Sequence, residues 1–266
     1  MKLHATKFFW WTAARGFTLV EIAVVMVVVG LLMMSMLLPL SAQLEQKAAA
    51  DTLKRMEDAR EALIAFALLN GRLPCPATSG SAGIEAPTGG GVCTQPYDGF
   101  LPARTLSIYP QSAGGNALDA WNNPIRYAVS KVTSSVYTKY TPGSAGIKYQ
   151  VSLNGLGDPG LQPDLRICAT ASAITNPGQP TATCGGQDIA STTSVVAVIY
   201  STGKNGALAA DASSRPDEAA NLNADRVFVS HLSAPSGSTG GEFDDILIWI
   251  SAGTLFNRMI AASVLP

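Results

Sequence analysis

The chain is poor in charged side chains and in histidine. Charged residues make up 14% of its 266 residues, the formal net charge is −1, and the two histidines are His4 and His231. Without a basic patch, the composition gives no support to nucleic-acid binding. With so few histidines and no C-x-x-C pair, it also argues against a zinc site built from Cys and His.

Familiar catalytic and phosphate-binding motifs are missing as well. No G-x-S-x-G sequence frames a serine, so we expect His231 to be a polar histidine in a sheet rather than part of a triad. The triple glycine at 89–91 is followed by no Lys-Ser or Lys-Thr, which favours a plain loop. Asp244 and Asp245 fall in an expected strand, where adjacent side chains point to opposite faces, so they should not share a site. The sequence predicts no catalytic constellation and no enzyme.

One long hydrophobic run lies near the N-terminus. Residues 1–16 are basic and contain no Asp or Glu, and an almost wholly apolar run follows over 17–40. A secretory signal peptide has a shorter apolar core, whereas a helix needs about 20 apolar residues to cross a bilayer. The run therefore predicts a transmembrane helix, with the basic leader on the cytoplasmic side and residues 71–266 outside.

The helical pattern continues beyond this run. Between 41 and 70 there is no Gly or Pro, and Leu53, Met56 and Leu63 recur at helical spacing among charged residues, which predicts an amphipathic helix. Asn70-Gly71 is a plausible C-terminal cap. The sequence thus predicts one helix over 17–70, of which the second half packs on a folded domain.

The remainder, 71–266, is expected to be a globular, β-rich domain. It begins with a long irregular stretch over 71–124, and strand-like runs rich in β-branched and aromatic residues follow, separated by Gly/Pro turn signals. These runs are 125–131, 135–140, 147–153, 165–171, 194–201, 225–231 and 242–251, and 254–265 has the spacing of a final helix. A long helix followed by an antiparallel sheet is an α+β fold.

Four cysteines lie in this domain, Cys75, Cys93, Cys168 and Cys184. An even number after an export segment favours disulfides in an oxidising compartment. Three connectivities are possible, and we prefer the two local pairs, Cys75–Cys93 and Cys168–Cys184. Each would close a Gly/Pro-rich loop and contribute about 3 kcal/mol by chain entropy.

The sequence "RGFTLVEI" at 15–22 resembles the prepilin signal of type IV pilins and of type II secretion pseudopilins. The resemblance implies cleavage by a prepilin peptidase between Gly16 and Phe17, N-methylation of Phe17, and Glu21 at the fifth mature position. Pro39, which would kink or locally melt the helix, lies close to the family's helix-breaking proline. The expected fold is then pilin-like, with 1–16 as leader peptide, 17–40 as transmembrane and filament-core helix, and 71–266 as the head domain.

The acidic residue in the apolar run needs a partner. A carboxylate inside a membrane span costs on the order of 3 kcal/mol on insertion scales, so it is normally paired or functional. Cleavage after Gly16 creates a cationic amine on Phe17, and Glu21 can neutralise it within one chain or between two chains. The resemblance implies the second use, in which the pair recruits a subunit into a growing filament.

A weaker resemblance lies in the head domain. "DAWNNPIRYAV" at 119–129 is similar to the D-P-W-G-N-P-Y element of major pseudopilins, with Asn122 in the place of the family's Gly. From the residues alone, we expect Trp121 to anchor this loop on the sheet and Asn123-Pro124 to form a turn.

A second weak resemblance concerns a metal. Residues 199–228 are similar to the calcium loop of major pseudopilins, which implies a possible calcium site. Asn205, Asp217 and Asp225 offer the oxygen ligands that calcium prefers. A solvated polar loop is the plainer interpretation of the same segment.

The function implied is that of a structural filament subunit of a type IV pilus or a type II secretion pseudopilus. The size of the body favours a minor pilin or pseudopilin. Implied partners are other pilin subunits, the prepilin peptidase and an inner-membrane assembly platform. The protein would sit in the bacterial inner membrane with its body in the periplasm, and then in a filament. The alternative is a periplasmic ligand-binding or enzymatic domain tethered by an uncleaved anchor.

Overall fold

The computed structural model describes residues 16–131, 136–139, 146–206, 211 and 213–266, and for 34–40 it describes the backbone alone. The predicted leader, 1–16, therefore lies outside the described residues except for Gly16. The chain divides into two compact units, Met1–Lys47 and Ala48–Pro266.

The longest element is the helix α1 (Leu19–Asn70). It contains Pro39 without a break, so the expected local melting at this proline does not occur. The helix ends where the sequence predicts. Gly71 has a φ of +66°, and its N–H group donates to the Ala67 carbonyl oxygen at 2.8 Å, which is the left-handed glycine cap of a helix C-terminus.

The predicted transmembrane helix over 17–40 is not supported by the structure. Within the part of the chain that is described, none of the helices combines the length and the hydropathy that a membrane crossing requires. At the end of the predicted span, over 34–40, the structure describes the backbone and not the side chains.

The second unit is built on an antiparallel sheet. Its strands are β1 (Gly99–Phe100), β2 (Arg126–Val129), β4 (Val195–Ser201) and β6 (Ile246–Ser251), in the order β1-β2-β4-β6. Every residue of β4 is buried. The main core includes Met56 and Leu63 from α1 together with Ile199 and Ile250 from the sheet. The predicted α+β class, a long helix with an antiparallel sheet, is confirmed.

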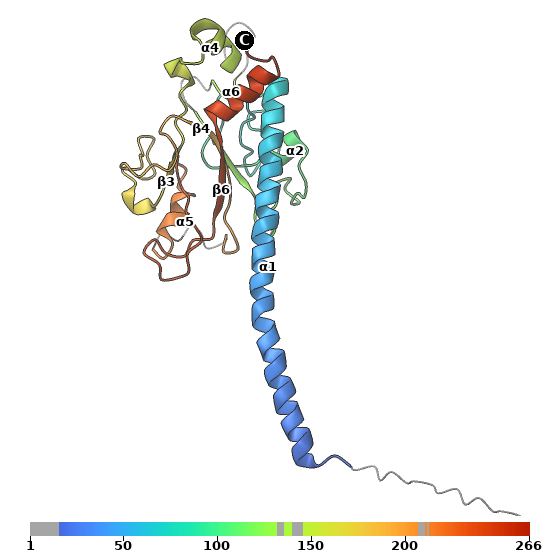
Figure 1. Cartoon of the computed structure of the whole chain (residues 1–266). Coiled ribbons are helices and arrows are strands. Elements are labelled where there is room, and N and C mark those ends of the chain that lie inside the picture. The colour runs from blue at the N-terminus through green and yellow to red at the C-terminus, as the bar shows by residue number, and fades with distance from the viewer. Residues whose placement is uncertain (1–15, 132–135, 140–145, 207–210, 212) are drawn as a thin grey trace, which may run out of the picture. The chain divides into compact units, whose positions relative to one another are not determined.

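A smaller parallel sheet, absent from the sequence prediction, pairs β3 (Arg166–Cys168) with β5 (Val227–Val229). Among the described residues, the other helices are α2 (Ala103–Leu106), α4 (Ile147–Asn154), α5 (Pro216–Ala220) and α6 (Ala252–Ala261), with 3-10 turns η1 (Pro159–Leu161) and η2 (Ala171–Ala173). Figure 1 shows α6 lying against the C-terminal end of α1, where Arg258 Nη2 meets Glu61 Oε2 at 2.6 Å.

One expected strand is wrong. Residues 147–153 form the helix α4, in which Ile147 and Val151 are buried four residues apart on one face. Their β-branched side chains had favoured a strand, but burial at helical spacing overrides that preference. The expected strand at 135–140 falls partly outside the described residues.

Both predicted disulfides are present. Cys75 is bonded to Cys93 and Cys168 to Cys184, and the Cα atoms are 5.3 Å apart in each pair. The first bond closes the irregular stretch after α1, and the second ties β3 to the loop that precedes β4.

The loop before β2 explains why Asn122 can stand where the related element has glycine. Asp119 Oδ1 accepts hydrogen bonds from the Trp121 and Asn123 N–H groups at 2.9 and 2.8 Å. Asn122 between them has a φ of +67°. Asparagine is among the few side chains that tolerate this left-handed conformation, so the turn survives the substitution.

Candidate functional site

The N-terminal motif surrounds the first turn of α1. Phe17 is 77% exposed. The Thr18 carbonyl oxygen accepts the first hydrogen bond of the helix, from the Ile22 N–H group at 3.2 Å. The Glu21 N–H group donates to Thr18 Oγ1 at 3.2 Å, and the Thr18 N–H group donates to Glu21 Oε2 at 3.4 Å. Glu21 itself is exposed in this first turn.

The helix that follows is apolar and exposed within its own unit. From Leu19 to Met33 all described side chains are exposed, and one of its faces carries Leu19, Val20, Ala23, Val24, Val27 and Val28. A helix that is hydrophobic all round is normally buried in a larger assembly or in a membrane.

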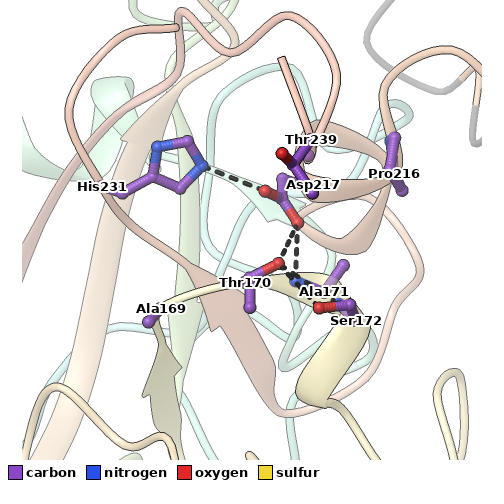
Figure 2. A pocket seen from close by; sticks show the side chains of 9 residues that line it. Ala169, Thr170, Ala171, Ser172, Pro216, Asp217, His231 and Thr239 are labelled. Carbon is purple, nitrogen blue, oxygen red and sulfur yellow. Dashed lines mark hydrogen bonds and ion pairs between the residues drawn. The ribbon is translucent and has the colours of Figure 1, made fainter.

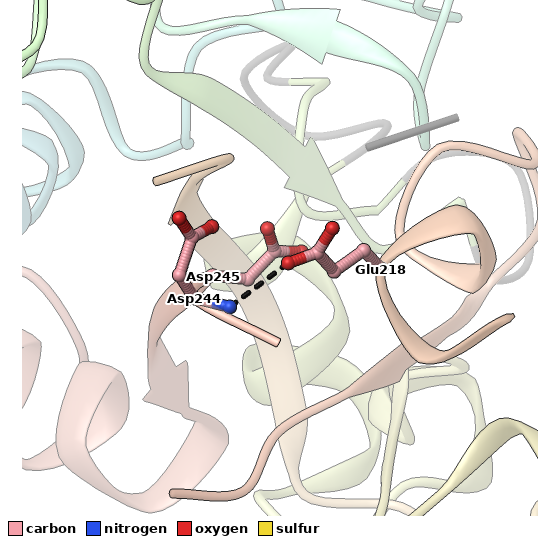
Figure 3. Close-up of side chains that lie close together, drawn as sticks. All are labelled: Glu218, Asp244 and Asp245. Carbon is pink, nitrogen blue, oxygen red and sulfur yellow. Dashed lines mark hydrogen bonds between the residues drawn. The ribbon is translucent and has the colours of Figure 1, made fainter. Parts of the chain in front are cut away.

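A second candidate site lies in the globular unit, where three carboxylates converge. Glu218 comes from α5, while Asp244 and Asp245 immediately precede β6. One carboxylate oxygen from each residue lies within 4.8 Å of the other two. Figure 3 shows the cluster, with the Asp244 N–H group donating to Glu218 Oε1 at 2.9 Å. The expectation that Asp244 and Asp245 cannot share a site is wrong, because they precede the strand and the alternation of a strand does not govern them.

Neighbouring groups form hydrogen bonds or ion pairs with some of the carboxylate oxygens of this cluster. The backbone N–H groups of Lys204 and Asn205 donate to Asp244 Oδ2 at 3.0 and 3.2 Å. The Asn221 side-chain amide donates to Asp245 Oδ2 at 2.6 Å. Arg215 Nε lies 3.6 Å from Glu218 Oε2.

Three further oxygens have no hydrogen-bond partner among the described residues. They are the buried Oδ1 atoms of Asn205, Asp244 and Asp245. Asp245 as a whole is 7% exposed, and the Asn205 amide nitrogen contacts both Glu218 oxygens at 3.0 and 3.1 Å. A buried acceptor without a donor is costly, and a cation held by the carboxylates would give such oxygens a partner.

Burial sets the electrostatics of the cluster. Desolvation raises the pKa of the Asp245 carboxyl well above its usual range, and the nearby charges of Glu218 and Asp244 raise it further. Desolvation also raises the pKa of the Glu218 and Asp244 carboxyls. The same burial makes it unfavourable for the three carboxylates to be ionised close together. Three hard oxygen ligands in such a position fit a cation of the calcium type.

A glycine lets the loop after β4 approach the cluster. Gly203 has a φ of +61°, and a Cβ atom added to it would lie 2.1 Å from Asp244 Oδ1. Any other residue at this position would displace the Asp244 carboxylate. The backbone N–H contacts that Lys204 and Asn205 make with Asp244 therefore depend on a residue without a side chain.

The predicted calcium ligands lie in three different hydrogen-bond networks. Asn205 belongs to the cluster just described. The Asp225 carboxylate accepts from the Gly178 and Val227 N–H groups, both at 2.7 Å. The Asp217 carboxylate accepts from the Ala171 N–H group at 2.6 Å and contacts His231. Glu218 lies in the same segment as the predicted ligands, directly after Asp217, whereas Asp244 and Asp245 lie outside it, so the composition of that one segment could not identify the cluster.

Asp217 and His231 line a pocket of about 510 Å³ together with Thr170, Ser172 and Thr239 (Figure 2). His231 Nε2 lies 3.1 Å from Asp217 Oδ2, and Nδ1 lies 2.7 Å from the Leu232 carbonyl oxygen. Both ring nitrogens thus face oxygen acceptors, so neither is directed at a hydroxyl nucleophile. His231 links a loop to α5 rather than lying in a sheet, which corrects the expected position.

The comparison with known families supports the N-terminal motif. Residues 11–37 match the family described as the prokaryotic N-terminal methylation motif. This is the prepilin-type signal of type IV pilins and pseudopilins, so the resemblance seen at 15–22 is confirmed. The motif indicates a membrane-anchored, pilin-like subunit and implies a prepilin peptidase and other pilin-like subunits as partners. Among curated proteins and among solved structures, nothing matches the chain.

Proposed function

We propose that the protein is a minor subunit of a type IV pilus-like or type II secretion pseudopilus filament. In this proposal the chain is cut between Gly16 and Phe17, methylated at Phe17 and assembled through the first part of α1. The observation that carries the proposal is the methylation motif at 11–37, which includes the first part of α1, where the apolar side chains are exposed within their own unit.

Helix packing supplies the cohesion of the filament. Leu19, Val24 and Val27 are 88, 56 and 62% exposed, and burial of such side chains yields about 1.5–3 kcal/mol each at full burial. Burial of several of them between subunits opposes the cost of association. Pro39 lies within this helix, and we assign it to the packed part of the assembled subunit.

Glu21 gives this packing its register. Cleavage after Gly16 leaves a positively charged amine on Phe17, and a Glu21 carboxylate from an adjacent subunit pairs with it. In an apolar bundle, an unpaired charge is strongly unfavourable, so subunits that are shifted along the axis are disfavoured. Before assembly, the protein is held at the bacterial inner membrane with its globular unit in the periplasm, and an inner-membrane platform feeds it into the filament.

Mass spectrometry of the mature N-terminus tests the maturation. We expect a chain that begins at Phe17 and carries one N-methyl group. An intact leader, or a cut elsewhere, would contradict the proposal and favour a tethered periplasmic domain instead. A strain without the prepilin peptidase provides the matched control, in which the full-length chain should accumulate.

Variants of Glu21 test the assembly step. Glu21→Gln and Glu21→Ala should still be cut and methylated, but their incorporation into filaments should fall at least about tenfold, because loss of one buried charge partner costs several kcal/mol. Wild-type incorporation of either variant would exclude the pairing with the Phe17 amine.

We further propose that the globular unit binds one calcium ion at Glu218, Asp244 and Asp245, with Asn205 beside them. The unpartnered Oδ1 atoms of Asn205, Asp244 and Asp245 support this assignment. Calcium accepts six to eight oxygen ligands in flexible geometry, which suits three carboxylates from two segments. The ion would offset two of the three negative charges and join α5 to the start of β6.

Thermal unfolding with calcium and with a chelator tests this site. We expect calcium to raise the melting temperature of the wild-type protein and Asp245→Asn to abolish the response, because a ligand that binds only the folded state stabilises it. Asp217→Asn and Asp225→Asn are the matched controls. Both remove a predicted ligand outside the cluster and should keep the response to calcium. No shift in the wild-type protein would contradict the proposal.

A further inference from the structure

Thr18 and Glu21 form reciprocal hydrogen bonds across the first turn of α1. Thr18 is the N-cap, because its carbonyl oxygen accepts the first helical hydrogen bond from Ile22. The Glu21 N–H group donates to Thr18 Oγ1 at 3.2 Å, and the Thr18 N–H group donates to Glu21 Oε2 at 3.4 Å. These reciprocal contacts are those of a capping box, which satisfies two N–H groups that lack a helical partner.

The same contacts restrain the Glu21 carboxylate. Thr18 Oγ1 also lies 3.5 Å from the Oε2 atom that the Thr18 N–H group faces. A carboxylate in the first turn is further attracted by the positive end of the helix dipole. Together these interactions hold the Glu21 charge at the N-terminal end of α1, beside Thr18, the residue that follows Phe17.

The capping box leaves room for a second partner. Both contacts with the Glu21 carboxylate, from the Thr18 N–H group and from the Thr18 hydroxyl, go to Oε2. The third contact of the pair joins the Glu21 N–H group to Thr18 Oγ1 and does not use the carboxylate. A carboxylate has about four acceptor positions on its two oxygens. Oε1 of Glu21 can therefore accept a cationic amine while Oε2 stays with Thr18.

We propose that Thr18 is a positioning residue for assembly, which holds the Glu21 carboxylate in place to receive the Phe17 amine of a neighbouring subunit. This inference rests on the proposed function as a filament subunit. Thr18 acts through Glu21 and does not itself touch the amine. A fixed carboxylate loses less conformational entropy when the pair forms than a freely rotating one.

Two substitutions separate the hydroxyl from the shape of the side chain. Thr18→Val has nearly the same volume but lacks the oxygen that caps the Glu21 N–H group. Thr18→Ser keeps that oxygen and is the matched control. Glu21→Gln keeps an amide that can complete a capping box but removes the charge.

The experiment measures incorporation of full-length, tagged variants co-expressed with the wild-type protein. Mass spectrometry gives the tagged fraction in purified filaments, divided by the tagged pool that is already cut and methylated. We expect Thr18→Ser to match wild type, and Thr18→Val to incorporate about fivefold less, the factor that corresponds to loss of an N-cap side chain. In a chain that already carries Glu21→Gln, Thr18→Val should cause no further loss, because both act on one interaction.

Three outcomes would overturn the inference. They are wild-type incorporation of Thr18→Val, a defect of Thr18→Ser as large as that of Thr18→Val, and a further fivefold loss in the Glu21→Gln background, which would show a cap that acts without Glu21. If Glu21→Gln fails to incorporate while Thr18→Val succeeds, the pairing of subunits stands and only the role of Thr18 falls. If Glu21→Gln incorporates normally, both fall.

Discussion

The two parts of α1 share strong helix formers but differ in what surrounds them. Over Leu19–Met33 the described hydrophobic side chains are exposed on all sides. Over 52–67 one face of the helix is fully buried, and its residues are Thr52, Met56, Ala59, Leu63 and Ala67. Steps of three and four residues place these five on one helix face.

The difference shows where each part finds its stability. The second part of α1 buries this face against strands and loops of its own chain, so folding completes it. Among the described residues of its own unit, the first part has no such partner, and in the proposed filament a neighbouring subunit supplies it. Substitutions in the globular unit should therefore act on unfolding, and those in the N-terminal unit should act on assembly alone.

The largest expected effect on unfolding concerns a buried ion pair. Glu85 Oε1 and Oε2 accept from the Arg72 guanidinium, both at 2.8 Å, and also from the Gly89 and Cys75 N–H groups. Glu85→Gln leaves the Arg72 charge buried without its counter-charge, which should lower the free energy of unfolding by about 3–5 kcal/mol. Urea unfolding followed by circular dichroism measures it.

The same change of residue elsewhere provides the controls. Glu61→Gln breaks a pair with Arg258 whose side chains are 53 and 52% exposed, and it should change stability by no more than about 1 kcal/mol. Glu21→Gln should leave unfolding of the globular unit unchanged. Equal losses of unfolding free energy from Glu85→Gln and Glu61→Gln would contradict the distinction between buried and exposed ion pairs.

A matched pair of core and surface truncations tests the two parts of α1 directly. Leu63 is fully buried, so Leu63→Ala should cost about 2–5 kcal/mol of unfolding free energy. Val27 is 62% exposed, so Val27→Ala should leave unfolding nearly unchanged and reduce incorporation into filaments instead. Unfolding curves and filament incorporation should be measured on both variants. A large unfolding effect of Val27→Ala would show that the N-terminal part already has a partner within its chain.

The disulfides stabilise the loops of the globular unit. The Cys168–Cys184 bond joins residues 16 apart, and the chain-entropy estimate for such a loop is about 3 kcal/mol. Replacing both cysteines by alanine should lower the unfolding free energy by about this amount and leave leader cleavage unaffected. An unchanged urea midpoint would mean that the loop is already ordered by its other contacts.

Local signals in the sequence predicted the local features. Gly71 ends α1, and Cys168 pairs with Cys184, because each feature depends on residues close in the chain. The prepilin motif at 15–22 was readable for the same reason. The strand expected at 147–153 failed because β-branched residues say little about which surface will bury them.

The acidic cluster could not be assembled from the sequence. Its members come from the loop after β4, from α5 and from the segment before β6, and only the folded chain brings Asn205, Glu218 and Asp244 together. Asp217 and Glu218 are adjacent, yet Asp217 contacts His231 and Glu218 contacts Asn205. Tertiary packing decides which neighbour faces which site, and residue type alone does not.

The smallest expected effect concerns how the stability of the globular unit depends on pH. Asp119 is 1% exposed, and burial raises the pKa of its carboxyl. Oδ1 accepts from two backbone N–H groups, and Oδ2 accepts from the Ser201 hydroxyl at 2.6 Å. The guanidinium of Arg55 contacts the Asp119 carbonyl oxygen. Because the folded pKa lies above the unfolded one, the stability linked to this group is present at low pH and is lost as pH rises through the folded pKa.

Asp119→Asn should remove that loss. An asparagine can keep the two backbone hydrogen bonds through its oxygen and donate to the Ser201 hydroxyl through its nitrogen, so the change at neutral pH should stay within about 1.5 kcal/mol. Unfolding free energies measured from acid to neutral pH should fall less steeply for the variant than for wild type. Since the N-terminal unit has no buried carboxylate among its described residues, Glu21→Gln should leave this pH profile unchanged. A steeper decline in Asp119→Asn would show that the Asp119 carboxylate is stabilised by its hydrogen bonds and by Arg55 more than burial penalises it.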